Sequence, residues 1–252
     1  ALQHVSINGK PAAKSFVGYD KYPVWSPNGS KIAFRSQERA GNEADKQRLF
    51  VYDTATGEMK YITAKFDYNA QNVVWQGEDT LYFIAPIEAT HQICRVRLDG
   101  SPVEVITSGD HDITSFSLAG DKCVATVQSI SMATELFEVD LANGQMHQLS
   151  HTNKEIYNNI RFGEVQKRWV RTTDGKKMLV WVILPPDFDP SQKYPTLLYC
   201  QGGPQSVVSQ FWSYRWNFQL MAAQGYVVVA PNRRGLPSFG QEWLDQLSGD
   251  YS

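Results

Sequence analysis

The sequence has little of what marks several large classes of protein. Its three cysteines, Cys94, Cys123 and Cys200, are too few and too widely spaced for a disulfide framework. Each lies in a strand-like run, so we interpret them as buried thiols. No apolar run approaches the roughly 20 residues that cross a bilayer, and we expect no membrane span. The formal net charge is -2, and no basic cluster with interleaved aromatic residues is present, which argues against nucleic acid as a partner.

Motifs of catalysis are missing as well. The sequence contains no Gly-x-Ser-x-Gly, the turn on which α/β-hydrolases present a nucleophilic serine. All five histidines, His4, His91, His111, His147 and His151, lie in the first 151 residues, where we interpret them as structural. There is no Cys-x-x-Cys and no phosphate-binding glycine loop, and we expect no metal and no cofactor.

What is present in the first 151 residues is a repeat of short strand-like runs and turns. The equivalent positions Thr63, Thr107 and Ser150 lie 44 and 43 residues apart. A period of about 40–45 residues with four short strands per unit is typical of β-propeller blades. The sequence therefore predicts three all-β blades. Because three blades do not close a ring, we expect further blades before Ala1.

One repeat contains a long polar loop between Phe34 and Arg48. Its acidic residues Glu38, Glu43 and Asp45 admit two interpretations. They form a cluster that binds the α-ammonium group of a substrate, or they belong to a solvated loop, which is the commoner role of a run of charges.

The later part of the chain changes to a pattern typical of α/β proteins. Two runs at 166–172 and 178–184 read as a hairpin. Apolar runs at 196–200 and 226–230 follow, and a helix is predicted between them from Trp212 to Gln224. Short unbroken apolar runs joined by a helix predict parallel strands that are covered on both faces.

A glycine pair, Gly202 and Gly203, follows the first of these apolar runs. Open α/β sheets place their ligand chemistry at the carboxyl ends of the strands. Glycine also lets backbone N–H groups come close to a developing negative charge. We interpret the pair as half of an oxyanion hole; the alternative is a tight turn after a strand.

In this region the sequence resembles the prolyl oligopeptidase family, in which a β-propeller precedes an α/β-hydrolase domain. The resemblance rests on Tyr194-Pro195, Gln201-Gly202-Gly203-Pro204 and Asn232-Arg233-Arg234-Gly235, in this order on the expected elements. It is closest to the bacterial dipeptidyl-peptidase and acylaminoacyl-peptidase branch. It implies the last blades of a partial β-propeller over residues 1–160 and the start of an α/β-hydrolase domain over residues 161–252. The sequence would then be an internal segment of a longer protein.

The resemblance also implies site residues. Family members hydrolyse short peptides with a Ser-Asp-His triad, which is expected after Ser252, so the residues present here are inactive alone. Gln201, Gly202 and Gly203 match the family's oxyanion loop. Related branches carry a tyrosine at the place of Gln201, and here the backbone N–H of Gly202 or Gly203 is expected to take over its task.

Three further residues are candidates for substrate binding. Arg234 lies at the rim of the active site, or else in a turn where it forms an ion pair. Trp212 and Tyr214 line a substrate pocket, or else belong to the core or to an interface.

The expected function is that of a serine exopeptidase that releases short peptides, most simply dipeptides, through an acyl-enzyme. Peptides are the expected partners, a homodimer of the whole protein is compatible with the resemblance, and the periplasm or the cell exterior is the expected location. Two alternatives stay open. One is a non-catalytic binding protein built from propeller and hydrolase-like parts, and the other is an esterase with the same oxyanion loop.

Overall fold

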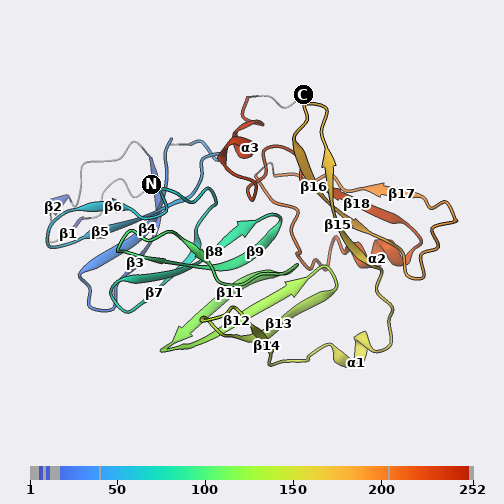
Figure 1. Ribbon diagram of the computed structural model, residues 1–252, viewed down its shortest axis with the longest axis horizontal. Helices are drawn as coiled ribbons and strands as arrows, with labels where there is room; N and C mark the ends of the chain where they lie inside the picture. The colour runs from blue at the N-terminus through green and yellow to red at the C-terminus, as the bar shows by residue number, and fades with distance from the viewer. Residues whose placement is uncertain (1–5, 8–9, 12–17, 40, 204, 250–252) are drawn as a thin grey trace.

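The computed structural model describes residues 6–7, 10–11, 18–39, 41–203 and 205–249, which include neither His4, nor Pro204, nor Ser252. Figure 1 shows two parts: the sheets of β1 to β14 on one side and the sheet of β15 to β18 on the other, with helix α3 near their junction. No helix in these ranges is long and apolar enough to cross a membrane.

Before position 150, the regular elements of the described residues are all β-strands. They form a two-stranded ribbon and three antiparallel units of four consecutive strands. The strands are β1 (Ser6–Ile7), β2 (Lys10–Pro11), β3 (Tyr19–Trp25), β4 (Lys31–Gln37), β5 (Arg48–Asp53), β6 (Met59–Tyr61), β7 (Gln71–Gln76), β8 (Thr80–Ile87), β9 (Thr90–Arg97), β10 (Glu104–Val105), β11 (Asp112–Ala119), β12 (Lys122–Ser129), β13 (Met132–Val139) and β14 (Met146–Gln148).

The predicted repeat is confirmed, and a hydrogen bond explains its most regular positions. The units are β3–β6, β7–β10 and β11–β14, and a single parallel bridge between β9 and β11 joins the last two. The hydroxyls of Thr63, Thr107 and Ser150 each accept a hydrogen bond from the backbone N–H fourteen residues earlier, at 3.0, 2.9 and 2.8 Å. That donor lies in the third strand of the same unit each time, so the hydroxyl ties the end of each unit to its own sheet.

The three units stack face to face. Leu81 and Phe83 of β8 belong to the hydrophobic cluster shared with the first unit. Tyr82 and Ile84 of the same strand belong to the cluster shared with the third unit. Because successive side chains of a strand point to opposite faces, the middle unit is buried on both sides, as a blade between two neighbours must be.

The cysteine prediction is correct for two residues and wrong for the third. Burial raises the pKa of the Cys94 thiol to about 12 and that of Cys123 to about 11, because the thiolate is poorly solvated there. Cys200 is exposed. It lies beyond the end of its strand, in a segment that the apolar run alone placed inside the sheet.

The second part has the mixed topology expected for the start of an α/β-hydrolase sheet. Strand β15 pairs antiparallel with β16, β16 pairs antiparallel with β18, and β18 pairs parallel with β17, in the order β15-β16-β18-β17. The elements are α1 (Lys154–Tyr157), β15 (Val165–Arg171), β16 (Lys177–Ile183), β17 (Thr196–Leu198), α2 (Phe218–Ala223), β18 (Val227–Pro231) and α3 (Gln241–Asp245).

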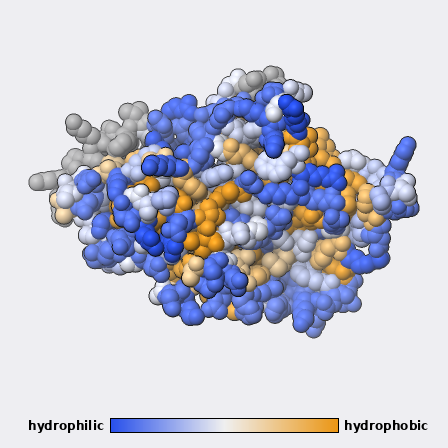
Figure 2. Space-filling view, in the orientation of Figure 1, coloured by the Kyte–Doolittle hydropathy of each residue, from blue (hydrophilic) through white to orange (hydrophobic). Residues whose placement is uncertain are grey.

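Coverage on both faces was predicted for the apolar runs that form β17 and β18; it holds for β18 and fails for β17. In β18, Val228 and Ala230 belong to one cluster, while Val227 and Val229 pack against the other. Strand β17 is the edge strand, and Leu198 is 63% exposed. Figure 2 shows hydrophobic residues at the surface over this second sheet and over the middle of the propeller units.

The predicted helix begins later than the sequence suggested. Residues 212–217 are not helical, and α2 begins at Phe218. The hydroxyl of Ser213 accepts hydrogen bonds from the backbone N–H groups of Arg215 and Trp216, at 3.2 and 2.8 Å, which favours a turn over a helix. Asn217 then caps α2 by accepting the N–H of Leu220 at 2.9 Å.

The two parts share a hydrophobic core. Ala89 and Ile130, at the tips of the β8–β9 and β12–β13 hairpins, belong to the same cluster as Trp181 and Val208 of the second part. The predicted boundary at residue 160 falls between β14 and β15, and it stays a prediction.

Candidate active site

Two loops leave the same edge of the second sheet. Strands β17 and β18 are parallel neighbours, so the segment after β17, residues 199–206, and the segment after β18, residues 232–236, start side by side. We call the stretch 201–210 the oxyanion loop candidate.

Arg233 connects the two loops. Its Nη2 donates to the backbone oxygen of Gln201 at 3.1 Å, and its Nη1 donates to the backbone oxygen of Arg234 at 2.8 Å. The indole Nε1 of Trp243 in α3 donates to the backbone oxygen of Arg233 at 2.9 Å. The guanidinium of Arg233 therefore bonds the backbone of both loops, while Trp243 fixes the backbone of Arg233 itself.

This contact sets the direction of the next N–H group. In the trans peptide between Gln201 and Gly202, the C=O and N–H groups point in opposite directions. The N–H of Gly202 is consequently turned away from Arg233. Gly202 is exposed, and a Cβ there would have no neighbour within 4 Å; Gly203 has φ +80°. No described residue accepts a hydrogen bond from either N–H. Both glycines thus offer unpaired donors at the carboxyl end of β17.

The far end of the loop is anchored at Val208. The side chain of Asn232, fully buried, accepts the N–H of Val208 and donates to its carbonyl oxygen, both at 3.0 Å. The indole of Trp181 donates to the same oxygen at 3.0 Å. The sequence motif includes Asn232 and Arg233 but does not indicate that they anchor this loop; their position directly after an apolar run was the available signal.

Arg234 is ion-paired. Its guanidinium contacts Asp174 of the β15–β16 turn and lies over the ring of Trp243, 4.8 Å from the centroid. A hydrogen bond from Thr172, and then the contact with Arg234, hold the pKa of Asp174 below its usual value. A pocket of about 380 Å³ is lined by these residues and Arg233. The geometry matches the ion-paired alternative for Arg234, at the side of a pocket.

The two candidate aromatics lie differently. Trp212 packs near Tyr157, with ring centroids 6.3 Å apart, and its indole Nε1 is buried without a partner among the described residues. Tyr214 is 90% exposed, with its ring at 6.3 Å from Trp212. Trp212 therefore packs against the connection between the two parts, and Tyr214 lies on the surface.

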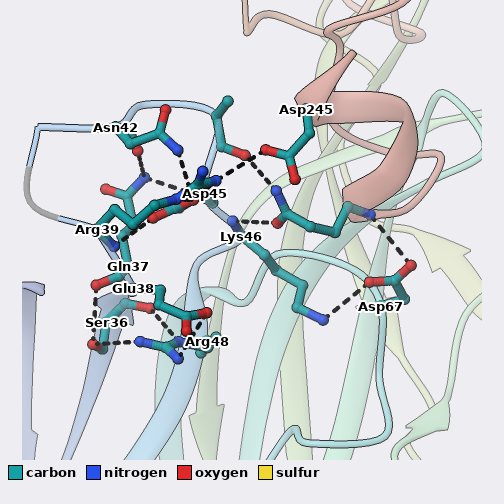
Figure 3. A network of polar contacts seen from close by, with 12 residues as sticks. Ser36, Gln37, Glu38, Arg39, Asn42, Asp45, Lys46, Arg48, Asp67 and Asp245 are labelled. Atoms are coloured by element: carbon teal, nitrogen blue, oxygen red, sulfur yellow. Dashed lines mark hydrogen bonds and ion pairs between the residues drawn. The ribbon is translucent and has the colours of Figure 1, made fainter. Parts of the chain in front are cut away.

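The polar loop of the first unit does not form an acidic cluster. Asp45 is buried and accepts hydrogen bonds from Arg39 Nε at 2.8 Å and from Asn42 at 2.7 Å (Figure 3). Burial opposes ionisation, but the hydrogen bonds from Arg39 outweigh it and lower the pKa of Asp45. Glu38 is 75% exposed in its side chain and lies 3.5 Å from Arg48. Glu43 is exposed and forms no hydrogen bond or ion pair with the described residues.

This loop contacts α3 instead. Arg39 also pairs with Asp245 at 3.1 Å, and Gln241 bonds the backbone of Ala44 and Lys46 at 2.7 and 2.6 Å. Figure 3 shows Arg39 between Asp45 and Asp245. A pocket of about 500 Å³ opens here and includes Glu38 in its lining, but not Glu43. No hydrogen bond or ion pair between described residues joins this loop to residues 201–203.

The described histidines all lie in or beside strands of the first part. His91 lies in β9 and His147 in β14, while His111 directly precedes β11 and His151 follows β14. Burial lowers the pKa of His111 below its ordinary value of 6.5, against the attraction of Asp112 and Asp110. The neutral imidazole is therefore the form that the fold favours.

We expect this histidine to make stability depend on pH. Because the pKa of His111 is lower in the folded state, its protonation favours unfolding: stability is complete above about pH 6.5 and is lost as the pH falls below that value through the lowered pKa. His111→Gln should reduce the drop in thermal midpoint between about pH 7.5 and about pH 5.5. Calorimetry at both pH values measures it, and equal drops in both proteins would contradict the prediction.

Comparison with known proteins agrees with this architecture. The profile described as "Dipeptidyl peptidase IV (DPP IV) N-terminal region" matches residues 10–179, and that described as "Prolyl oligopeptidase family" matches residues 212–252. A dipeptidyl-peptidase 5 of Porphyromonas gingivalis is 46% identical over 240 residues, 95% of this chain. The chain belongs to the prolyl oligopeptidase family. Its two parts are accordingly blades of a β-propeller and the start of an α/β-hydrolase domain.

Other similar proteins are more distant from this chain. A dipeptidyl-peptidase 5 of Trichophyton equinum is 28% identical over 97% of the chain. Acylaminoacyl peptidase of Pyrococcus horikoshii shares the fold, with a TM-score of 0.79 at 22% identity over 96% of this chain and 37% of that one. The chain spans about a third of the length of the curated relatives it matches.

Proposed function

We propose that this chain supplies the oxyanion loop and part of the propeller of a serine exopeptidase. The observation that carries the proposal is the hydrogen bond from Arg233 to the backbone oxygen of Gln201, which leaves the N–H groups of Gly202 and Gly203 unpaired at the carboxyl end of β17. Preorganised N–H donors of this kind stabilise the negative oxygen of a tetrahedral intermediate.

In the proposed reaction, a serine outside these 252 residues attacks the scissile carbonyl carbon while a histidine base takes its proton. The carbonyl oxygen becomes an oxyanion that accepts hydrogen bonds from Gly202 or Gly203 and from the residue after the nucleophile. The C–N bond then breaks, the amine leaves with the proton, and an acyl-enzyme ester forms. Water hydrolyses the ester and restores the serine.

The substrate class is proposed from the relatives. The name dipeptidyl-peptidase 5, carried by relatives up to 46% identical, supports release of dipeptides from the N-terminus of short peptides. The propeller units pack directly against the hydrolase sheet, which supports a site covered by the propeller and closed to folded proteins.

The roles of the other candidate residues rest on the same proposal. Glu38 lines a pocket and its ion-pair partner among the described residues, Arg48, is 3.5 Å away, so its exposed carboxylate is available to a substrate ammonium group. Glu43, Trp212, Tyr214 and Arg234 stay candidates for substrate binding. The location outside the cytoplasm and the homodimer also stay predictions.

The longer protein that carries this chain provides the test. We would compare turnover of a dipeptidyl p-nitroanilide with a free N-terminus, an N-acetyl-aminoacyl p-nitroanilide and a p-nitrophenyl ester, and label the protein with a fluorophosphonate. The expected result is fastest turnover of the dipeptidyl substrate and labelling of one serine outside residues 1–252.

The alternatives predict other results. A folded protein with neither turnover nor label would favour a binding protein, and ester turnover without peptide turnover would favour an esterase. A preference for the N-acetylated substrate would retain the peptidase and reject dipeptide release.

A further inference from the structure

A hydrogen bond crosses from the oxyanion loop candidate to the propeller. The hydroxyl of Ser209 donates to Asp112 Oδ2 at 2.6 Å, and both residues are buried. The next residue, Gln210, is also buried, and its Oε1 accepts the backbone N–H of Ile130 at 3.2 Å. The loop that begins at Gln201 in the hydrolase part is therefore bonded at its end to two separate segments of the propeller, at Asp112 and at Ile130.

The surroundings of Asp112 show that its carboxylate is committed to this contact. Asp112 is 2% exposed, and its Oδ1 lies 2.8 Å from Nδ1 of His91. His91 and Asp112 are partners in the bridge that joins β9 to β11. A carboxylate in such a place accepts short, strong hydrogen bonds. The imidazole holds one oxygen within the propeller, and the other oxygen faces Ser209.

The loop is held at both ends by side chains from different parts of the protein. Arg233 fixes the carbonyl of Gln201 at the start. Asn232 clamps Val208, and Asp112 holds the adjacent Ser209. Between these anchors Gly202 and Gly203 are exposed. With the far anchor released, the position of the two glycine N–H groups depends on the hydrolase side alone.

We propose that Asp112 is a positioning residue for the oxyanion loop and acts through Ser209, so that the propeller takes part in catalysis by holding hydrolase backbone in place. The inference rests on the proposed function of Gly202 and Gly203. Displacement of a reacting group by about 1 Å can cost on the order of 100-fold in rate. Loss of this anchor should therefore weaken stabilisation of the oxyanion in the transition state, and it should change substrate affinity little because the oxyanion does not exist in the bound substrate.

The test is Ser209→Ala in the longer protein, with Ser150→Ala as matched control. The hydroxyl of Ser150 also donates to a buried carboxylate, Glu135, but within one propeller unit. Ser209→Ala should lower kcat about 10- to 100-fold with little change in KM. It should weaken the binding of a peptide boronic acid, whose tetrahedral adduct occupies the oxyanion site, more than it weakens the binding of the product dipeptide. Ser209→Thr, which keeps the hydroxyl, should restore most of the rate, and Ser150→Ala should match the wild type.

A second readout does not depend on turnover. Hydrogen exchange of the peptide containing residues 201–210 should be faster than in the wild type in both Ser209→Ala and Asp112→Asn. In the double variant it should be no faster than in whichever single variant exchanges faster, because both changes remove the same contact. Unchanged exchange, an effect on KM alone, or an equal loss in Ser150→Ala would overturn the proposal. A wild-type protein without turnover would overturn the proposed function, and exchange would still decide whether the propeller holds the loop.

Discussion

Arg233→Ala is expected to lower kcat by about 100- to 1,000-fold, the range seen when one oxyanion donor is lost. Without the guanidinium, the carbonyl of Gln201 loses its donor at 3.1 Å, and the peptide that carries the N–H of Gly202 is free to rotate. The N–H then points at the oxyanion only part of the time. KM should change little, because the ground-state substrate does not depend on this contact.

The neighbouring arginine is the matched control. Arg234 carries the same charge, but its guanidinium contacts Asp174 and Trp243 and not the loop. Arg234→Ala should therefore retain most of kcat, with a change in KM if the residue also binds substrate. Arg233→Lys should recover only part of the rate, since an ammonium group lacks the planar fork that reaches two backbone oxygens. Steady-state kinetics on a dipeptidyl substrate decides, and equal losses of kcat in the two alanine variants would refute the role of Arg233.

The second large effect is on stability. Trp181→Ala should destabilise the hydrolase part by about 3–5 kcal/mol, the usual cost of removing a large buried aromatic side chain. Trp181 is fully buried in the cluster with Leu179, Ile183 and Val208. Its indole also donates to the carbonyl of Val208, so the variant leaves a cavity beneath the far anchor of the loop.

Trp169 is the control for this variant, because it lies on the partner strand of the same hairpin. It is 43% exposed, with Phe239 at 6.1 Å as its ring neighbour. Trp169→Ala should cost about 1 kcal/mol or less, in proportion to the smaller area it buries. Trp181→Phe should fall between the two, since it keeps most of the volume and loses one hydrogen bond. Denaturant unfolding followed by circular dichroism measures all three, and equal costs for the two alanine variants would contradict the assigned core.

Patterns local to the chain predicted elements well. The spacing of Thr63, Thr107 and Ser150 predicted the repeat because each hydroxyl bonds within its own unit, fourteen residues back. The parallel pairing of the two apolar runs was also predictable. One local prediction was wrong: the helix was predicted from Trp212, but the Ser213 hydroxyl accepts backbone N–H groups in a turn and the helix begins only at Phe218.

Side-chain partners were not predictable in the same way. Asp45 looked like one of three free acidic residues, yet it is buried against Arg39. Arg233 and Arg234 are adjacent and chemically identical, and only the fold assigns one to the loop and the other to Asp174. The bond from Ser209 to Asp112 joins positions 97 residues apart, a separation over which no sequence period extends.

The sequence by itself determined the blades, the hydrolase sheet and the glycine pair after its strand, because hydrophobic period, turn residues and hydroxyl spacing act over a few residues. Tertiary structure alone decided which groups hold that glycine pair: Arg233 from the next loop, and Ser209 with Asp112 from the propeller. Hydrogen bonds between distant residues depend on how whole sheets pack, and that packing is a property of the complete fold.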